Sequence, residues 1–161
     1  MRFCTGAIIT ALALLLLFAA CTRRAVEGSQ RDLDPTNTQL TTIEVVVRGI
    51  RSHEGQILLA LFTSPDGFPG DTEKAMHRMK SLIEGDEVTF TISRIPPGPY
   101  AISVLHDENA NNRMETDFLG RPKEGHGFSR NARGRFGPPG FDDAIFRVTG
   151  VSLELQIDLR Y

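Results

Sequence analysis

Apolar residues recur at every second position in several stretches of the chain. Residues 43–47, 88–92 and 100–104 show this alternation, and residues 151–159 show it most regularly. A period of two places one face of a β-strand in a core and the other face in solvent. Each of these stretches therefore predicts a half-buried strand.

Shorter apolar segments complete the predicted set of strands. Residues 56–62 are almost wholly apolar between Gly55 and a Ser-Pro-Asp-Gly turn, and 80–83 and 144–148 are shorter candidates. We expect Thr149-Gly150 to be the hairpin turn between the last two strands. Residues 71–79 are the one helical candidate, with Asp71 as the N-cap and basic residues toward the end. Together these segments predict an all-β, seven- or eight-stranded antiparallel β-sandwich with one short helix.

The first twenty residues, 1–20, have the pattern of a signal peptide. Arg2 precedes an almost wholly apolar stretch, 7–20, which is short for a membrane span of about 20 apolar residues. Residues 17–21, Leu-Phe-Ala-Ala-Cys, resemble a bacterial lipobox, in which the cysteine is lipidated and becomes the new N-terminus. We therefore predict lipidation of Cys21. Plain cleavage that leaves Cys21 as a free thiol is the alternative.

The residues after Cys21 predict where the protein is held. Residues 21–41 are mostly polar and cannot bury enough surface to fold, so we expect a flexible tether followed by a domain over 42–161. Thr22, rather than an aspartate, follows the cysteine, which resembles outer-membrane sorting. The predicted location is the bacterial cell envelope, with the protein anchored by lipid to the outer membrane and facing the periplasm or the exterior.

Charge and composition exclude several classes of protein. The 161 residues include 18 basic and 20 acidic ones, and the formal net charge is −2. A nucleic-acid partner would require clustered Lys and Arg, so none is expected. The composition also argues against a disordered, collagen-like or polytopic membrane protein. The length predicts one domain.

Residues 106–143 interrupt the rhythm of the strands. This segment is long, polar and rich in glycine, and it carries phenylalanines that include Phe128 and Phe136. A flexible loop rarely holds so many aromatic residues. We predict a long ordered loop, anchored by Phe128 and Phe136 against one end of the sandwich, with a functional role.

Oxygen-bearing side chains occupy alternate positions at the start of this loop. The residues are Asp107, Asn109, Asn111, Arg113 (whose backbone carbonyl would serve) and Glu115. Calcium takes six to eight oxygen ligands and is bound by loops with this spacing. Asn112 stands where such loops have glycine, and Asn tolerates the left-handed conformation. The bidentate glutamate at the twelfth position is missing, so we favour an Asx-rich turn over a calcium site.

Two catalytic arrangements are also conceivable in the loop. Histidines and carboxylates could form a transition-metal or acid–base site, and a serine could act as a hydrolytic nucleophile. The first would use His106, His126, Asp107 and Glu124, and the second would use Ser129, His106 and Asp142. The spacing lacks a third metal ligand, and the serine lacks a nucleophile elbow. Neither arrangement is favoured.

Arginines lie among the glycines of the loop. Arg133 and Arg135, with Arg130 beside them, could bind a carboxylate or phosphate, since guanidinium forks suit these anions. The favoured alternative is that Arg133 or Arg135 pairs internally with an aspartate and holds the loop in place. The candidate partners are Asp107, Asp142 and Asp143.

Several long segments together resemble one known family. They are Ile-Pro-Pro-Gly-Pro-Tyr at 95–100, Val-Leu-His-Asp-Glu-Asn at 104–109, and most of 120–146. These segments resemble a bacterial exported family, domain of unknown function 2141, and the resemblance covers about 43–159. It implies a secreted or lipid-anchored bacterial protein with no established activity. The Pro-Pro-Gly-x-Tyr segment is also similar to the strand entry of transthyretin-like β-sandwiches.

We therefore expect a non-enzymatic, lipid-anchored envelope module that binds a ligand or has a structural role. Its partners would be the membrane, through the anchor, and an unidentified envelope protein or small ligand. No cofactor is certain from the sequence, and calcium, as a stabilising ion, is the one candidate. The ligand surface would lie on the 106–143 loop, at His106, His126, Arg133, Arg135, Asp142 and Asp143. The alternative is a metal-dependent envelope enzyme that uses His106, Asp107 and His126.

Overall fold

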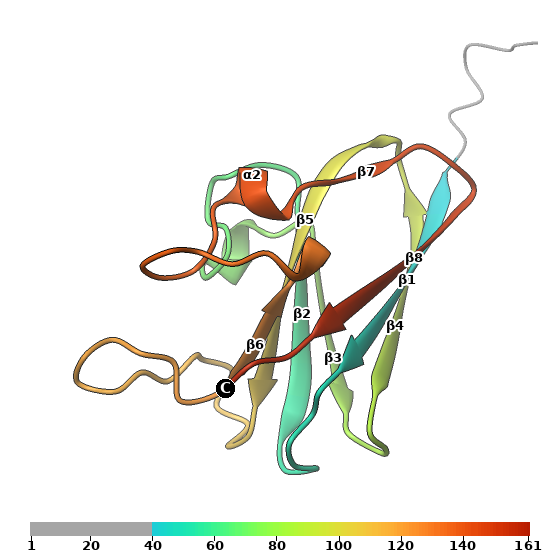
Figure 1. Ribbon diagram of the computed structural model, residues 1–161. Helices are drawn as coiled ribbons and strands as arrows, with labels where there is room; N and C mark the ends of the chain where they lie inside the picture. The colour runs from blue at the N-terminus through green and yellow to red at the C-terminus, as the bar shows by residue number, and fades with distance from the viewer. Residues whose placement is uncertain (1–39) are drawn as a thin grey trace, which may run out of the picture. The chain divides into compact units, whose positions relative to one another are not determined.

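The computed structural model describes residues 40–161. The predicted signal peptide, the predicted lipidation site Cys21 and nearly all of the predicted tether lie outside the described residues. The described residues form eight strands in two sheets, which confirms the all-β sandwich (Figure 1). No helix within residues 40–161 has the length and apolar character needed to cross a membrane.

The smaller sheet has three strands, in the order β4 (Val88–Ile95), β1 (Thr41–Arg48) and β8 (Ser152–Asp158). The central strand β1 is antiparallel to β4 and parallel to β8. A parallel pair needs a connection that returns the chain to the same end of the sheet. The rest of the domain forms that connection, so the first and last strands of the described chain lie together.

The larger sheet has the order β3 (His77–Leu82), β2 (Gln56–Phe62), β5 (Gly98–Asp107) and β6 (Gly125–Phe128). A further short strand, β7 (Phe146–Val148), pairs with the first three residues of β5. Two 3₁₀ turns, η1 (Thr72–Lys74) and η2 (Ser129–Asn131), and the short helix α2 (Phe141–Ala144) join these strands.

The main core lies between the two sheets. It contains Ile43, Val45 and Val47 of β1 and, from the facing sheet, Ile57 and Leu59 of β2. The period-two pattern assigned the three β1 residues to the buried face, and the two β2 residues belong to the continuous apolar run 56–62. Burial of each such side chain stabilises the fold by about 1.5–3 kcal/mol.

A second apolar cluster covers the other face of β2 and β5. Phe62 and Ala101 from these strands pack with Phe128, Phe141 and Ala144 from the segment 125–144. Phe68 contacts Phe62 and Phe141 edge-to-face, with ring centroids 5.4 and 5.7 Å apart. Because β2 is buried on both faces, its sequence lacks the alternation seen in β1.

The predicted helix over 71–79 is wrong. Only the 3₁₀ turn η1 forms there, the side chain of Asp71 makes no capping bond, and β3 begins at His77. The backbone N–H of Met76 donates to the carbonyl of Leu61, and β3 then pairs along β2. Sheet pairing therefore outweighs a charge pattern that favours a helix, as tertiary contacts commonly do.

The predicted hairpin at Thr149-Gly150 is also wrong. The strand before it, β7, pairs with β5 of the larger sheet, whereas β8 pairs with β1 of the smaller sheet. The connection therefore crosses between the sheets. The hydroxyl of Thr41 donates to the carbonyl of Gly150, and the backbone N–H of Thr42 donates to that of Val151, so β1 holds the crossing segment.

Candidate functional site

Asp107 organises the loop that follows β5. Its side chain is fully buried. One carboxylate oxygen accepts hydrogen bonds from the backbone N–H of Asn112 at 2.8 Å and from Nε2 of Gln56 at 2.9 Å. The other accepts the N–H of Asn111 at 3.0 Å. A buried carboxylate is tolerated only when it is satisfied in this way.

The remaining oxygens of the calcium-like motif also accept hydrogen bonds within the loop. Oδ1 of Asn109 accepts the N–H of Asn111 at 3.1 Å, and Oδ1 of Asn111 accepts the N–H of Arg113 at 2.8 Å. Glu115 accepts from Nδ2 of Asn111 at 3.2 Å. Asn112 has φ of 62°, the left-handed conformation expected for it. Residues 40–161 contain no group of three or more His, Cys, Asp or Glu side chains suited to a metal ion. The geometry fits the Asx-rich turn better than a calcium shell.

Two glutamates stabilise the two ends of this loop. Glu124 is 3% exposed, and its carboxylate accepts the backbone N–H groups of Glu108 at 3.2 Å and Glu115 at 3.1 Å. Glu108 in turn accepts from Nε of Arg51 and from the hydroxyl of Ser52, both at 2.9 Å. The hydrogen-bonded Arg51 guanidinium lowers the pKa of Glu108 to about 2. Glu108 therefore keeps its charge where an ordinary glutamate would be protonated.

His106 belongs to the same network and is fully buried. Its Nε2 lies 3.0 Å from the carbonyl of Glu54, and its Nδ1 lies 2.7 Å from the hydroxyl of Tyr161. Because a carbonyl only accepts, Nε2 donates to it, while Nδ1 shares the second hydrogen bond with the tyrosine hydroxyl. That hydroxyl also accepts the N–H of Arg51 at 3.0 Å. Both ring nitrogens are therefore occupied by the fold.

The two histidines lie on opposite faces of the larger sheet. In the β5–β6 ladder His106 pairs with Gly125 and Leu105 pairs with His126. Paired residues share a face and successive residues alternate, so His126 lies on the face of Leu105 and away from His106. The grouping of both histidines predicted for a metal-dependent or acid–base enzyme is therefore wrong.

Ser129 also has a structural role. It is fully buried, its hydroxyl donates to the carbonyl of Ala144 at 2.6 Å, and it accepts the N–H of Ile102 at 3.0 Å. These bonds attach η2 to α2 and to β5. His106 lies on the core-facing side of β5 beneath Tyr161, and Asp142 is exposed on α2. These three residues of the conceivable hydrolase therefore have separate surroundings.

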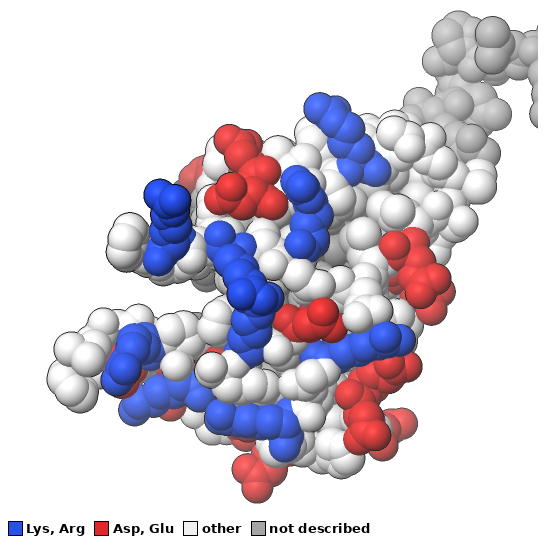
Figure 2. Space-filling model, in the orientation of Figure 1, with Lys and Arg blue, Asp and Glu red and all other residues white. Residues whose placement is uncertain are grey.

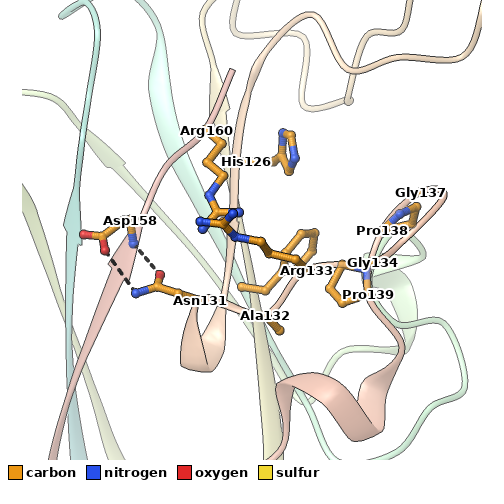
Figure 3. A pocket seen from close by; sticks show the side chains of 12 residues that line it. His126, Asn131, Ala132, Arg133, Gly134, Gly137, Pro138, Pro139, Asp158 and Arg160 are labelled. Atoms are coloured by element: carbon orange, nitrogen blue, oxygen red, sulfur yellow. Dashed lines mark hydrogen bonds between the residues drawn. The ribbon is translucent and has the colours of Figure 1, made fainter.

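A cleft of about 180 Å³ opens where the chain beyond β8 meets β6 (Figure 3). Arg160 and His126 pair through two backbone hydrogen bonds, of 2.8 and 2.9 Å, which attach the end of the chain to the larger sheet. The approach is close, since a Cβ on Gly127 would lie 2.7 Å from Cγ2 of Ile157. The lining residues are His126, Gly127, Phe128, Asn131, Ala132, Arg133, Gly134, Gly137, Pro138, Pro139, Asp158 and Arg160.

Asn131 and Asp158 fix one wall of the cleft. Nδ2 of Asn131 donates to the Asp158 carboxylate at 3.0 Å, and the N–H of Asp158 donates to Oδ1 of Asn131 at 2.9 Å. The second carboxylate oxygen of Asp158 accepts from Nε2 of Gln156 at 3.0 Å. Asp158 is thus bound by amides, and η2 is joined to β8.

Two arginines point toward each other across the cleft. Figure 3 shows the guanidinium groups of Arg133 and Arg160 approaching the same space from the loop and from the end of the chain. Within residues 40–161 neither side chain forms an ion pair. Figure 2 shows further basic side chains across this face of the domain. The cleft therefore gathers two arginines that form no ion pair within the described residues, and the one carboxylate in its lining, Asp158, is bound by amides.

The predicted pairing of Arg133 or Arg135 with an aspartate is wrong. Asp107 is occupied by the N–H groups of its own loop, and Asp143 accepts the N–H of Gly140 at 3.1 Å. Asp142 forms no ion pair within the described part of the chain, and Arg135 is exposed outside the lining of the cleft. The loop is held by its apolar side chains and by Asn131 instead.

The sequence pattern missed Arg160, Asn131 and Asp158. Arg160 and Asp158 alternate with buried leucine and isoleucine at the end of the chain, which is the pattern of solvent-facing residues on a strand. The pairing of Arg160 with His126 and the hydrogen bonds between Asp158 and Asn131 bring this end beside the loop. No local signal in the sequence indicates that contact.

Comparison with known proteins identifies one family. A family model described as an uncharacterised protein conserved in bacteria (DUF2141) matches residues 45–156. The match runs from within β1 to within β8 and includes one of the two arginines, Arg133. No curated protein and no solved structure matches the chain.

Proposed function

The chain belongs to this family of bacterial proteins, and we propose that it is a lipid-anchored cell-envelope module that binds an anionic group. The ligand is a carboxylate or phosphate, held in the cleft between Arg133 and Arg160. The module binds its ligand without chemical conversion. The lipid anchor on Cys21 holds it at the outer membrane.

The convergence of Arg133 and Arg160 carries this proposal. Two like charges that face the same space repel each other, and an anion between them would offset that repulsion. Guanidinium groups present paired N–H donors whose geometry matches carboxylate and phosphate oxygens. Small-molecule pockets commonly measure about 300–1,000 Å³. The cleft, at about 180 Å³, suits a single acidic group better than a whole metabolite.

The pairing of polar groups supports a binding role over catalysis. The carboxylate of Asp107 and both nitrogens of His106 are occupied by hydrogen bonds inside the fold. A general base needs an open lone pair within reach of a substrate proton. Calcium, if it binds, would act on the Asp107 loop as a stabilising ion and would leave the role of the cleft unchanged.

Inorganic phosphate and acetate are expected to bind the purified protein in the cleft. NMR titration should show chemical-shift changes confined to the cleft residues. Either Arg133→Gln or Arg160→Gln should weaken binding about tenfold, the effect of losing one charge-assisted contact of about 1.5 kcal/mol. Arg94→Gln is the matched control, since Arg94 is exposed on β4 and forms no ion pair within residues 40–161. Equal affinities in all variants, or no binding by the unmodified protein, would contradict the proposal.

Changing Cys21→Ser is expected to release the protein from the membrane fraction. The substitution removes the thiol that would carry the lipid, while the apolar stretch before it is unchanged. Fractionation of cell envelopes, followed by immunoblotting, measures the distribution. If the variant and the unmodified protein fractionate alike, the anchor is not on Cys21.

A further inference from the structure

Two neighbouring loops expose large apolar side chains to solvent. Phe118 and Leu119, in the loop 117–121, are 93% and 63% exposed, and Phe136, in the loop 132–140, is 101% exposed. We refer to these three residues as the apolar tips. None of them lines the arginine cleft. The predicted anchoring role of Phe136 is therefore wrong, and the side chain needs another explanation.

Hydrogen bonds hold Phe118 and Leu119 in their exposed positions. One oxygen of Asp117 accepts the backbone N–H groups of Leu119 and Arg121, each at 2.9 Å. The other accepts Nε of Arg121 at 2.8 Å, and Thr116 pairs with Pro122 at the base of the turn. The backbone donors, chiefly the N–H of Arg121, lower the pKa of Asp117, so this carboxylate stays charged and keeps its bonds. The turn therefore displays the apolar side chains instead of burying them.

The second tip is built on a close backbone contact. A Cβ on Gly134 would lie 2.2 Å from the carbonyl oxygen of Gly137, so the two sides of this loop touch at the glycines. Pro138 and Pro139 follow directly and restrict the backbone further. Phe136 lies between these fixed points, is fully exposed, and is not part of the second apolar cluster that Phe128 joins.

Basic side chains flank both tips. Arg121 and Lys123 follow Phe118 and Leu119, and Arg133 and Arg135 precede Phe136. Within residues 40–161 only Arg121 of these four forms an ion pair, with Asp117. Figure 2 shows two projections on one side of the domain, separated by a notch and bearing basic side chains. Each projection thus combines an apolar tip with positive charge behind it.

We propose that the two tips insert into the interface of a membrane that contains anionic phospholipids. Aromatic and aliphatic side chains enter the boundary between head groups and acyl chains, while Arg and Lys behind them contact the phosphates. The charge of the four flanking residues complements such a surface. A protein-binding site would more commonly present a contiguous apolar patch, whereas these tips are separate projections. Apart from Arg133, which also lines the arginine cleft, this surface is separate from the cleft, and it goes beyond the proposed function.

The absence of tryptophan from the sequence allows a direct test. Phe118→Trp and Phe136→Trp each introduce a single fluorophore at a tip, and Leu82→Trp places one at a control site that is 71% exposed on β3. The full chain is reconstituted with vesicles of phosphatidylglycerol and phosphatidylcholine. Emission from the two tip variants should shift to shorter wavelength and be quenched by brominated acyl chains. Emission from the Leu82→Trp variant should stay that of a solvent-exposed indole.

Charge dependence completes the test. The shift of tryptophan emission should be much smaller with vesicles of phosphatidylcholine alone. In the Phe136→Trp protein, Arg135→Glu should also reduce this shift. Tip variants that behave like Leu82→Trp would overturn the proposal, and so would quenching of equal strength in uncharged vesicles. A shift that appears only after envelope proteins are added would also overturn it, in favour of a protein partner. The Arg160→Gln phosphate titration is independent of all these outcomes, since Arg160 does not flank the tips and the tips do not line the cleft.

Discussion

Replacing Asp107 with alanine is expected to lower the free energy of unfolding by about 3–5 kcal/mol. The carboxylate is fully buried and accepts three hydrogen bonds, two of them from backbone N–H groups at the turn. Each hydrogen bond to a charged group contributes about 1.5–3 kcal/mol, and the desolvation of the carboxylate offsets part of the sum. Alanine would also leave the buried amide of Gln56 short of an acceptor. Urea denaturation, monitored by circular dichroism, measures the loss.

Asp142→Ala is the matched control for Asp107→Ala. Asp142 is exposed on α2 and forms no ion pair within residues 40–161, so its replacement should change the free energy of unfolding by less than about 0.5 kcal/mol. Calcium separates the two interpretations of the loop. The Asx-rich turn predicts an unchanged melting temperature when calcium is added, whereas a rise in the unmodified protein alone would support the calcium site. Equal stability of the Asp107→Ala and Asp142→Ala variants would contradict the organising role of Asp107.

Phe128→Ala is expected to cost about 3–4 kcal/mol of unfolding free energy. The ring is 8% exposed and packs with Phe62, Ala101 and Phe141 in the second apolar cluster. Phe68 contacts its ring at a centroid distance of 6.1 Å. Removing it leaves a cavity beneath η2 and α2, which those short elements cannot refill. Thermal and urea unfolding both measure the effect.

Phe136→Ala supplies an unusually close control for this second substitution. The same residue type lies in the same segment, but it is 101% exposed, so its truncation should change stability by less than about 0.5 kcal/mol. If Phe128→Ala were as mild as Phe136→Ala, the segment 125–144 would not be held by its apolar contacts with β2 and β5.

Alternation along the chain was sufficient to predict the strands that have one buried face. In β1 and β4 most residues alternate between the core face and the solvent face, with Val46 and Ile95 as buried exceptions, and the structure confirms both strands. The β6 strand could not be predicted in the same way. Its sequence, Gly-His-Gly-Phe, is short, has two glycines and contains only one strand-favouring residue, Phe128. It forms because β5 offers an edge and because Gly125 and Gly127 let the end of the chain approach closely.

Of the two arginines of the candidate site, the sequence indicated only Arg133, because the site also depends on a contact between distant segments. Arg133 stood out because an arginine among glycines has little to pack against. Arg160 did not, since a charged residue at an outward position of the last strand needs no explanation. The cleft arises from a contact between segments that are far apart in the sequence, and such contacts leave no local periodicity.

The pairing of β1 with β8 has a consequence for the order in which the domain can fold. The hydroxyl of Thr41 binds the carbonyl of Gly150, which lies 109 residues further along the chain. Contacts between such distant segments form slowly, because closing the long loop between them costs conformational entropy before the contacts can stabilise the fold. During synthesis the smaller sheet therefore stays incomplete, because its central strand β1 lacks its partner β8 until that strand has been made. We therefore expect a nascent chain of this topology to stay unfolded until β8 has been made.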